Sequence, residues 1–297
     1  MAISSVPVEA AREGRLAAAL GGAGTFTRRN PTLVIGGAAL SLLALCAIAA
    51  PLITGYDPIA LDVVSRLKPP TAEHLFGTDM MGRDIFARVI YGSRVSLTVG
   101  LSVAVIATAI GLVVGLAAGL LRWVDVVVMR VMDGLMAIPS VLLAIAFMAL
   151  AGSSIRNIII AITIPEIPRI ARLVRGIVMS VKEQPFVEAA IAAGTKDIAL
   201  LRRHILPSTI NPLIVQATYI AASAIISEAY LSFLGAGTPP EIPSWGNIVA
   251  EGRSLFTIAP GAVLFPSAFL ALTVLAVNML GDGLRDRLDP QMQRGLR

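Results

Sequence analysis

The chain has 297 residues, of which 56% are hydrophobic and only 14% charged, with a mean hydropathy of +0.81 and a net charge of +5. Soluble domains typically carry about 25% charged residues, so this composition excludes an ordinary soluble fold and indicates a membrane protein. Because open sheet edges cannot lie in lipid, the spanning segments are predicted to be helices and the fold class to be all-α.

Six apolar runs have the length needed to cross a hydrocarbon core about 30 Å thick, so we predict six transmembrane helices. In chain order the predicted spans are Thr32–Ile53, Val95–Leu121, Val126–Leu150, Asn157–Arg172, Pro212–Phe233 and Gly261–Leu280. The first run follows basic residues, and Ala47-Ile48-Ala49 resembles a signal-peptide cleavage site. Its apolar stretch is too long for a signal peptide, which favours an uncleaved anchor.

Lysine and arginine are distributed unevenly between the two sides of this topology. With the N-terminus inside, most of the 24 basic residues fall in cytoplasmic segments, so both termini are assigned to the cytoplasm. The predicted organisation is a cytoplasmic tail (1–30), a transmembrane anchor (31–54), an extracytoplasmic segment (55–94), a transmembrane core (95–284) and a second cytoplasmic tail (285–297).

No cofactor site is predicted in this chain. Residues 77–84, GTDMMGRD, come close to the phosphate-binding pattern G-x-x-x-x-G-K-[ST]. Arg83 and Asp84 replace the lysine and the hydroxyl that phosphate and magnesium require, so any ATP is expected to bind a partner. The two histidines, His74 and His204, lie far apart without cysteine or histidine neighbours, so no metal site is expected.

Three glycines in the second predicted span, Gly111, Gly115 and Gly119, form two overlapping G-x-x-x-G units. Small residues at this spacing let helices pack at close range. The packing partner could be a helix of this chain or of another subunit, and the sequence leaves both open.

Two acids, Glu166 and Glu228, stand inside predicted spans and are the candidates for a translocation path. Glu166 is predicted to lie roughly 15 Å deep and is flanked by Pro165 and Pro168. It could face a water-filled path, or it could form a local ion pair with Arg169, three residues further on. Glu228 lies nearer the outer end of the fifth span.

A charged segment, EAAIAAGTKDIALLRRHILP (188–207), is predicted to form two short helices at the cytoplasmic surface. Pro185 suits the first turn of the first helix, and Gly194 is placed to end it in a left-handed conformation. Thr195 is expected to cap the second helix and Pro207 to end it.

One face of the first short helix is predicted to be a docking surface, because its alanines allow a partner's backbone to approach closely. The residues on this face are Phe186, Ala189, Ala190 and Ala193. An amphipathic helix resting on lipid headgroups is the alternative.

The spacing of Glu188-Ala189-Ala190, Gly194 and Leu206-Pro207 resembles the cytoplasmic loop of binding-protein-dependent ABC importer permeases. In that family the loop, here 182–207, forms coupling helices that fit a cleft on the ATP-hydrolysing subunit. Residues 77–101, 226–253 and 275–290 resemble the dipeptide/oligopeptide/nickel type, specifically its C-type subunit. Where relatives often carry Gly-Trp-x-x-Tyr, this chain reads EIPRI (166–170), which leaves the substrate open.

The resemblance implies a type I importer fold in a bacterial or archaeal cytoplasmic membrane, and a transport subunit rather than an enzyme. It implies four kinds of partner: a homologous second permease, two ABC ATPase subunits that hold ATP and Mg, an extracytoplasmic binding protein and membrane lipid. No nucleic acid is expected. The implied cargo is di- or oligopeptides, with nickel chelates or another small solute as the alternative.

The sequence argues against two other functions. A proton-coupled secondary transporter would use intramembrane acids and repeated halves with matching broken helices, and no such pair is recognisable. A membrane-embedded hydrolase would need a nucleophile and a base, yet both histidines lie outside the predicted spans. Trp245, in the outer loop, is predicted to be an interfacial anchor or a contact for the binding protein.

Overall fold

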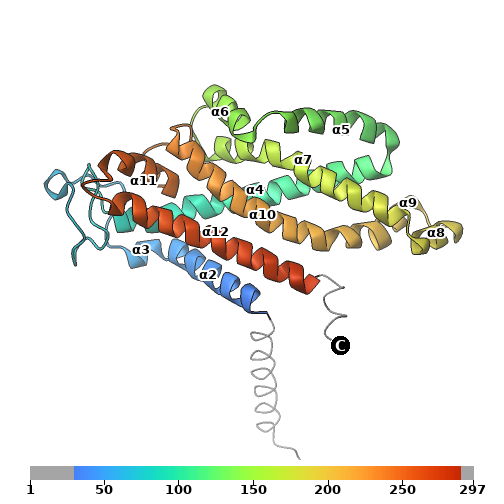
Figure 1. The fold of residues 1–297 in the computed structure, drawn as a ribbon, viewed down its shortest axis with the longest axis horizontal. Coiled ribbons are helices and arrows are strands. Elements are labelled where there is room, and N and C mark those ends of the chain that lie inside the picture. The colour runs from blue at the N-terminus through green and yellow to red at the C-terminus, as the bar shows by residue number, and fades with distance from the viewer. Residues whose placement is uncertain (1–29, 289–297) are drawn as a thin grey trace, which may run out of the picture.

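The computed structural model describes residues 30–288, and this part of the chain is built from helices without strands. Four long helices run roughly along the same axis (Figure 1): α4 (Ile85–Leu120), α7 (Ile155–Lys182), α10 (Leu206–Phe233) and α12 (Gly261–Leu288). α4 packs against α7 and α10, and the N-terminal helix α2 (Pro31–Ile48) lies along α12. The predicted all-α fold is confirmed.

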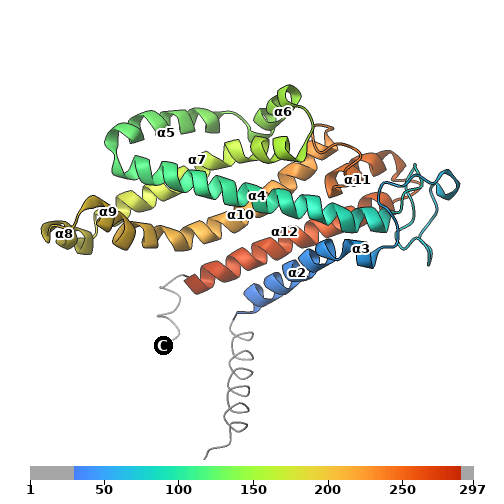
Figure 2. The same cartoon turned by 180° about the vertical axis from the view of Figure 1, so that it is seen from behind.

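Shorter elements join these helices. They are α3 (Ala50–Ile53), η1 (Val63–Ser65), α5 (Arg122–Ala137), α6 (Ser140–Ala151), α8 (Pro185–Ala192), α9 (Asp197–Leu200), η2 (Leu201–Ile205), α11 (Trp245–Gly252) and η3 (Arg253–Leu255). Seen from behind, α8 and α9 lie at one end of the molecule, and α11 lies at the other end with the loops before α4 (Figure 2).

The predicted count of six spans is not confirmed. Within the described residues, four helices are long and apolar enough to cross a membrane: Pro31–Ile48, Ile85–Leu120, Asp197–Phe233 and Gly261–Leu288. A fifth candidate is the pair α5 and α6, bent by 90° at its break. The third predicted span, Val126–Leu150, is therefore wrong as a single helix, because Pro139 forces Ile138 into an extended conformation.

The second span begins at Ile85, ten residues before the predicted Val95. The Asp84 side chain caps this helix by accepting a hydrogen bond from the Ala87 N–H at 2.7 Å. Charged side chains in the first turns made the segment look like a loop, but the fold satisfies them. Arg94, for example, donates to the carbonyl oxygens of Ala47 and Ile48, where α2 ends.

The glycines of α4 pack against α7 of the same chain. A Cβ atom on Gly111 would lie 2.6 Å from Ile170 Cβ, and one on Gly119 would lie 2.6 Å from Val178 Cβ. At Gly115 it would lie 2.6 Å from a backbone oxygen of α7. The sequence left open whether these glycines pack against a helix of this chain or of another subunit. The structure shows that this glycine stripe packs against a helix of this chain.

Trp245 was predicted to be an interfacial anchor or a contact for the binding protein, and the anchor prediction is wrong. It is fully buried at the start of α11, and its indole Nε1 donates to the Val89 carbonyl of α4 at 3.0 Å. A Ser244 hydroxyl that accepts from the Asn247 N–H at 3.2 Å caps α11 and fixes this position. The connection between the last two long helices is thus packed into the fold. The predicted tails fall mainly on residues 1–29 and 289–297, which lie outside the described part.

Candidate functional site

The first short helix of the 182–207 segment ends as predicted. Gly194 has a φ of +79°, in the left-handed region that glycine adopts most easily. The Gly194 N–H donates to Ile191 O at 2.9 Å and the Thr195 N–H donates to Ala190 O at 3.0 Å, which satisfies the last carbonyls of α8. The chain therefore reverses sharply between α8 and α9.

The second short helix differs from its prediction at both ends. Lys196, not Thr195, occupies the N-cap of α9, and no side chain caps the helix. Pro207 does not end it: η2 is a π-helical turn that continues into α10, giving one helix from Asp197 to Phe233. The Leu206 N–H bonds back to Leu201 O, and this wider turn makes room for the Pro207 ring.

The loop presents large apolar side chains to its surroundings. Phe186, Ile191 and Ile198 leave 48%, 56% and 72% of their surface exposed. Val187 and Leu200 are buried in the main core and hold the two short helices against the bundle. Exposed apolar side chains on such a fixed support mark an interaction surface.

The predicted coupling residues are mostly accessible on this surface. Glu188, Ala189 and Pro207 are exposed, while Ala190 and Leu206 are half-buried. Of the predicted docking face, Phe186 and Ala193 are exposed as well.

Glu166 lies on α7, buried between helices, and is only 5% exposed. Its Oε2 forms an ion pair with Arg169 Nη1 at 3.0 Å, and the Ser223 hydroxyl of α10 is 3.5 Å from its Oε1. The ion pair with Arg169, one of the two alternatives that the sequence offered for Glu166, is therefore present. Arg169 itself is half exposed, so the pair connects the buried carboxylate to the surface of the bundle.

The helices α7, α10 and α12 border an open groove of about 660 Å³. Its polar lining residues are Ser208, Asn211, Gln216, Tyr219 and Arg285. The Tyr219 hydroxyl donates to Asp282 Oδ1 of α12 at 2.6 Å, and the Asn211 amide is 3.5 Å from Leu288 O. We call this feature the α10 groove.

Glu228 has a different environment and belongs to neither the ion pair nor the groove. It is fully buried, and its carboxylate accepts hydrogen bonds from Ser232 at 2.8 Å and from Ser96 of α4 at 3.1 Å. The Ser96 bond joins α4 to α10, while the Ser232 bond lies within α10. The two acids are thus not brought together, and the geometry of Glu228 favours a structural role.

Comparison with known proteins identifies the family. A family model described as the inner membrane component of binding-protein-dependent transport systems matches residues 90–294. This chain belongs to that family. A second model, the N-terminal transmembrane domain of oligopeptide transport permease C, matches residues 27–70 of the permease. Family membership makes the chain a multi-pass inner-membrane transport component and not an enzyme.

Several relatives match the permease over nearly its whole length. A probable peptide ABC transporter permease of Sinorhizobium fredii is 54% identical, covering 91% of this chain and 92% of the relative. A glutathione transport system permease of Salmonella typhimurium is 47% identical, covering 90% and 89%. A dipeptide transport system permease of Alkalihalophilus pseudofirmus is 43% identical, covering 90% and 88%.

A solved structure supports the same fold for the permease. A chain of the inward-facing MetNI methionine ABC transporter matches with a TM-score of 0.52 at 19% identity, covering 69% of this chain and 98% of that one. The likeness confirms the ABC importer permease fold that the sequence predicted.

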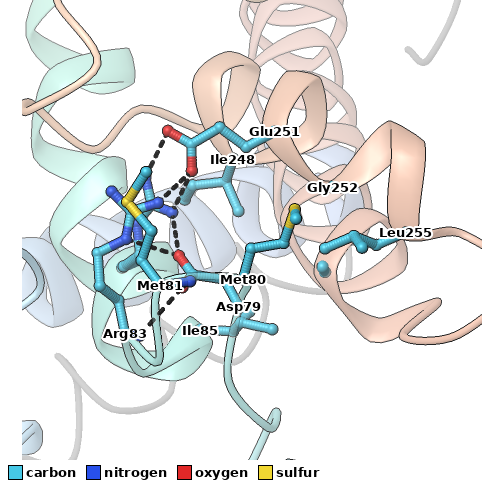
Figure 3. A pocket seen from close by; sticks show the side chains of 11 residues that line it. Asp79, Met80, Met81, Arg83, Ile85, Ile248, Glu251, Gly252 and Leu255 are labelled. Atoms are coloured by element: carbon cyan, nitrogen blue, oxygen red, sulfur yellow. Dashed lines mark hydrogen bonds and ion pairs between the residues drawn. The ribbon is translucent and has the colours of Figure 1, made fainter. Parts of the chain in front are cut away.

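The permease also contains an ion-pair network that the sequence did not reveal (Figure 3). Asp79 Oδ2 accepts from Arg83 Nε and from Arg88 Nη1, each at 2.7 Å, and Glu251 Oε2 accepts from Arg88 Nη1 at 2.6 Å. Arg88, on α4, is 1% exposed, and Glu251 belongs to α11. Two carboxylates thus neutralise two buried guanidinium groups, as buried charges require.

This network joins parts of the permease that lie far apart in sequence. Asp79, Arg83 and Arg88 fall between the two family matches, at 27–70 and 90–294, whereas Glu251 falls inside the second. A cavity of about 150 Å³ lies beside the network, lined partly by Met80 and Met81. A sequence sign of the network was the alternation of acids and bases between residues 79 and 88.

Proposed function

We propose that this permease forms half of the membrane channel of an ATP-driven importer that takes up di- or oligopeptides. A homologous second permease would supply the other half, and an extracytoplasmic binding protein would deliver the cargo. The proposal is supported by the names of relatives that align over about nine-tenths of the chain, which are peptide, dipeptide and glutathione transport permeases.

Two ABC ATPase subunits would drive transport from the cytoplasmic side, and ATP and Mg would bind to them rather than to this chain. Their docking surface would be the coupling loop, 182–207. The observation that carries this assignment is the pair of short helices, which the core holds in place while Phe186, Ile191 and Ile198 remain exposed. In this orientation both termini are cytoplasmic, and α11 with the loops before α4 lies outside.

Reconstitution tests the proposal. The permease, co-expressed with its genomic partners and purified through a tag on this chain, is expected to bring down two ATPase subunits and a second permease. In proteoliposomes the complex should import a radiolabelled dipeptide only when ATP and the binding protein are both present. Import without ATP, driven by a proton gradient, would instead identify a secondary transporter.

The identity of the cargo is tested in the same vesicles. A dipeptide, a longer peptide and a nickel chelate, each supplied with the binding protein, should give ATP-dependent uptake of the peptides. Uptake of the nickel chelate alone would overturn the peptide assignment and leave the importer assignment intact.

A further inference from the structure

The lining of the α10 groove is organised along one helix face. Residues 208, 211, 212, 215, 216 and 219 recur at steps of three and four, which places them on one side of α10. One turn beyond Tyr219 on the same side is Ser223, whose hydroxyl is 3.5 Å from Glu166 Oε1. A polar stripe therefore runs from the coupling-loop end of α10 to the buried carboxylate.

This stripe is ill suited to contact with lipid. Asn211 is exposed and Gln216 half-exposed in the isolated chain, and Gln216 lies about 15 Å along α10 from its start at Leu206. Uncompensated side-chain amides against hydrocarbon are costly, so polar residues on such helices face a water-filled cavity or another subunit. The groove is therefore turned away from lipid, toward a water-filled cavity or another subunit.

The chemistry of the groove fits a peptide backbone. Each side-chain amide, on Asn211 and on Gln216, can donate and accept hydrogen bonds at once, as each peptide group of a cargo does. Arg285 adds a guanidinium, the group that suits a terminal carboxylate. The volume of about 660 Å³ lies within the range of small-molecule sites, roughly 300–1,000 Å³.

We propose that the α10 groove is a transit site that holds the cargo by its backbone amides, with Asn211 and Gln216 as the hydrogen-bonding residues. This proposal rests on the peptide cargo proposed above. Recognition through the backbone does not depend on the cargo's side chains, so one permease can pass peptides of different sequence. Cargo leaving the neighbourhood of Glu166 enters this site before it reaches the cytoplasm.

A photo-crosslinking experiment tests the site in the assembled importer. The photoreactive amino acid p-benzoylphenylalanine is placed at position 216, or at position 214 as the matched control. Ile214 is exposed on the same helix but does not line the groove. During ATP-driven import of a radiolabelled dipeptide, position 216 should be labelled by the peptide and position 214 should not. Equal labelling of both positions, or of neither, would overturn the proposal.

A transport measurement gives a second, independent test. Gln216→Leu keeps the side-chain size but removes both hydrogen-bonding groups, and uptake should fall about threefold to tenfold. Ile214→Ala should leave uptake unchanged. Wild type should import a dipeptide that is N-methylated at its amide more slowly than the unmodified dipeptide, because it binds this peptide less well. Gln216→Leu should then reduce uptake of the methylated dipeptide by a smaller factor than it reduces uptake of the unmodified one.

The two levels of proposal fail in distinguishable ways. If the wild-type complex imports no peptide, the proposed function fails. If wild type imports peptide while Gln216→Leu and the doubly substituted Asn211→Ala, Gln216→Leu protein do so at the same rate, the transit site alone is wrong.

Discussion

Glu166 shows how a single carboxylate is accommodated inside a buried helix. Pro165 and Pro168 flank it within α7, and each proline lacks the N–H that would bond the carbonyl one turn earlier. Arg169 neutralises the carboxylate at 3.0 Å, while Ser223 offers a second, weaker contact. The ion pair is intact, and its guanidinium end is half exposed at the surface of the bundle.

Removing the charge of Glu166 should change transport more than folding. In Glu166→Gln the partner left behind, Arg169, is half exposed, so water can solvate it and no buried charge stays unpaired. If Glu166 attracts the cationic group of a cargo, uptake of a lysine-containing dipeptide should fall about tenfold, a loss typical of one charged hydrogen bond. Uptake of a neutral dipeptide should fall less, and the amount of purified complex should match wild type.

A purely structural ion pair predicts another result for the same variant. Folded protein would then decrease, and uptake of every cargo would fall in proportion to it. Parallel assays with cationic and neutral dipeptides, normalised to the amount of complex, separate the two.

Arg88 is the residue whose replacement we expect to be most damaging. Its guanidinium is 1% exposed and donates to both Asp79 and Glu251. Arg88→Met would leave Asp79 with one partner fewer in a buried site, a change that costs about 3–5 kcal/mol when a buried pair is broken. We expect a lower midpoint of thermal unfolding and little purified protein, measured by fluorescence-detected size exclusion.

A matched variant separates the effect of the buried network from the effect of losing any arginine. Arg172 pairs with Asp133 at the surface, where both side chains are more than half exposed. Arg172→Met should shift the unfolding midpoint only slightly, because exposed ion pairs contribute little. Equal shifts of the unfolding midpoint for the two variants would show that the burial of the network does not determine its contribution to stability.

At the scale of elements, the turn between α8 and α9 depends on one glycine. The φ of +79° at Gly194 is unfavourable for a β-branched residue by about 1–2 kcal/mol, although nothing within 4 Å would clash with a new Cβ atom. Gly194→Val should therefore misorient the two short helices without disturbing the core. We expect normal insertion but at least a tenfold loss of uptake, with ATPase subunits bound weakly or hydrolysing ATP without import.

Gly194→Asn is the control for this prediction, since asparagine tolerates the left-handed region better than valine. It should retain much of the uptake. Normal uptake by Gly194→Val would remove the coupling role from this turn.

The contact between α4 and α7 offers a test of packing. Gly115→Val would place side-chain atoms where only 2.6 Å separates a Cβ atom from Ala171 O, so the helices must move apart. Gly134→Val on α5 adds the same group where nothing lies within 4 Å. The first variant should lower the unfolding midpoint by several degrees and the second should not. Similar midpoints would show that the stripe does not set the helix spacing.

Sequence patterns located the helices better than their boundaries. Apolar runs found α2, α10 and α12, and Gly194 marked the end of α8, because these signals are local. The early start of α4 and the burial of Trp245 were missed, since both depend on distant partners such as Glu251 and the Val89 carbonyl. Pro207 was read as a stop because a one-dimensional pattern does not show that a π-helical turn absorbs it.

The candidate site was also predicted in part. The 182–207 loop was predicted from its resemblance to the cytoplasmic loop of importer permeases, and Glu166 with its possible Arg169 pair was predicted from position and spacing. The α10 groove was not, although its residues recur at steps of three and four, because an apolar helix with scattered polar residues gives a weak periodic signal. The groove is formed where α10 packs with α7 and α12, an arrangement that only the tertiary structure contains.

At the scale of the whole molecule, the proposed orientation places α8 and α9 in the cytoplasm and residues 55–84 outside. Single cysteines test it in a protein whose own Cys46 has been changed to alanine. Val64 is 88% exposed and suits the outer position better than its buried neighbour Ser65, and Ser208 serves for the cytoplasmic side. An impermeant thiol reagent on intact cells should label Val64→Cys and spare Ser208→Cys until the membrane is permeabilised. The reverse pattern would invert the topology.

The continuous helix from Asp197 to Phe233 connects the coupling loop to the neighbourhood of Glu166. Its 37 residues span about 55 Å, and Ser223 lies about 39 Å from the coupling end. A tilt of about 5° imposed at the coupling end would displace Ser223 by roughly 3 Å, comparable to its 3.5 Å distance from Glu166. In the proposed importer, a motion that an ATPase subunit imposes on the coupling loop would therefore reach Glu166 as a tilt of this one helix, with no separate hinge between them.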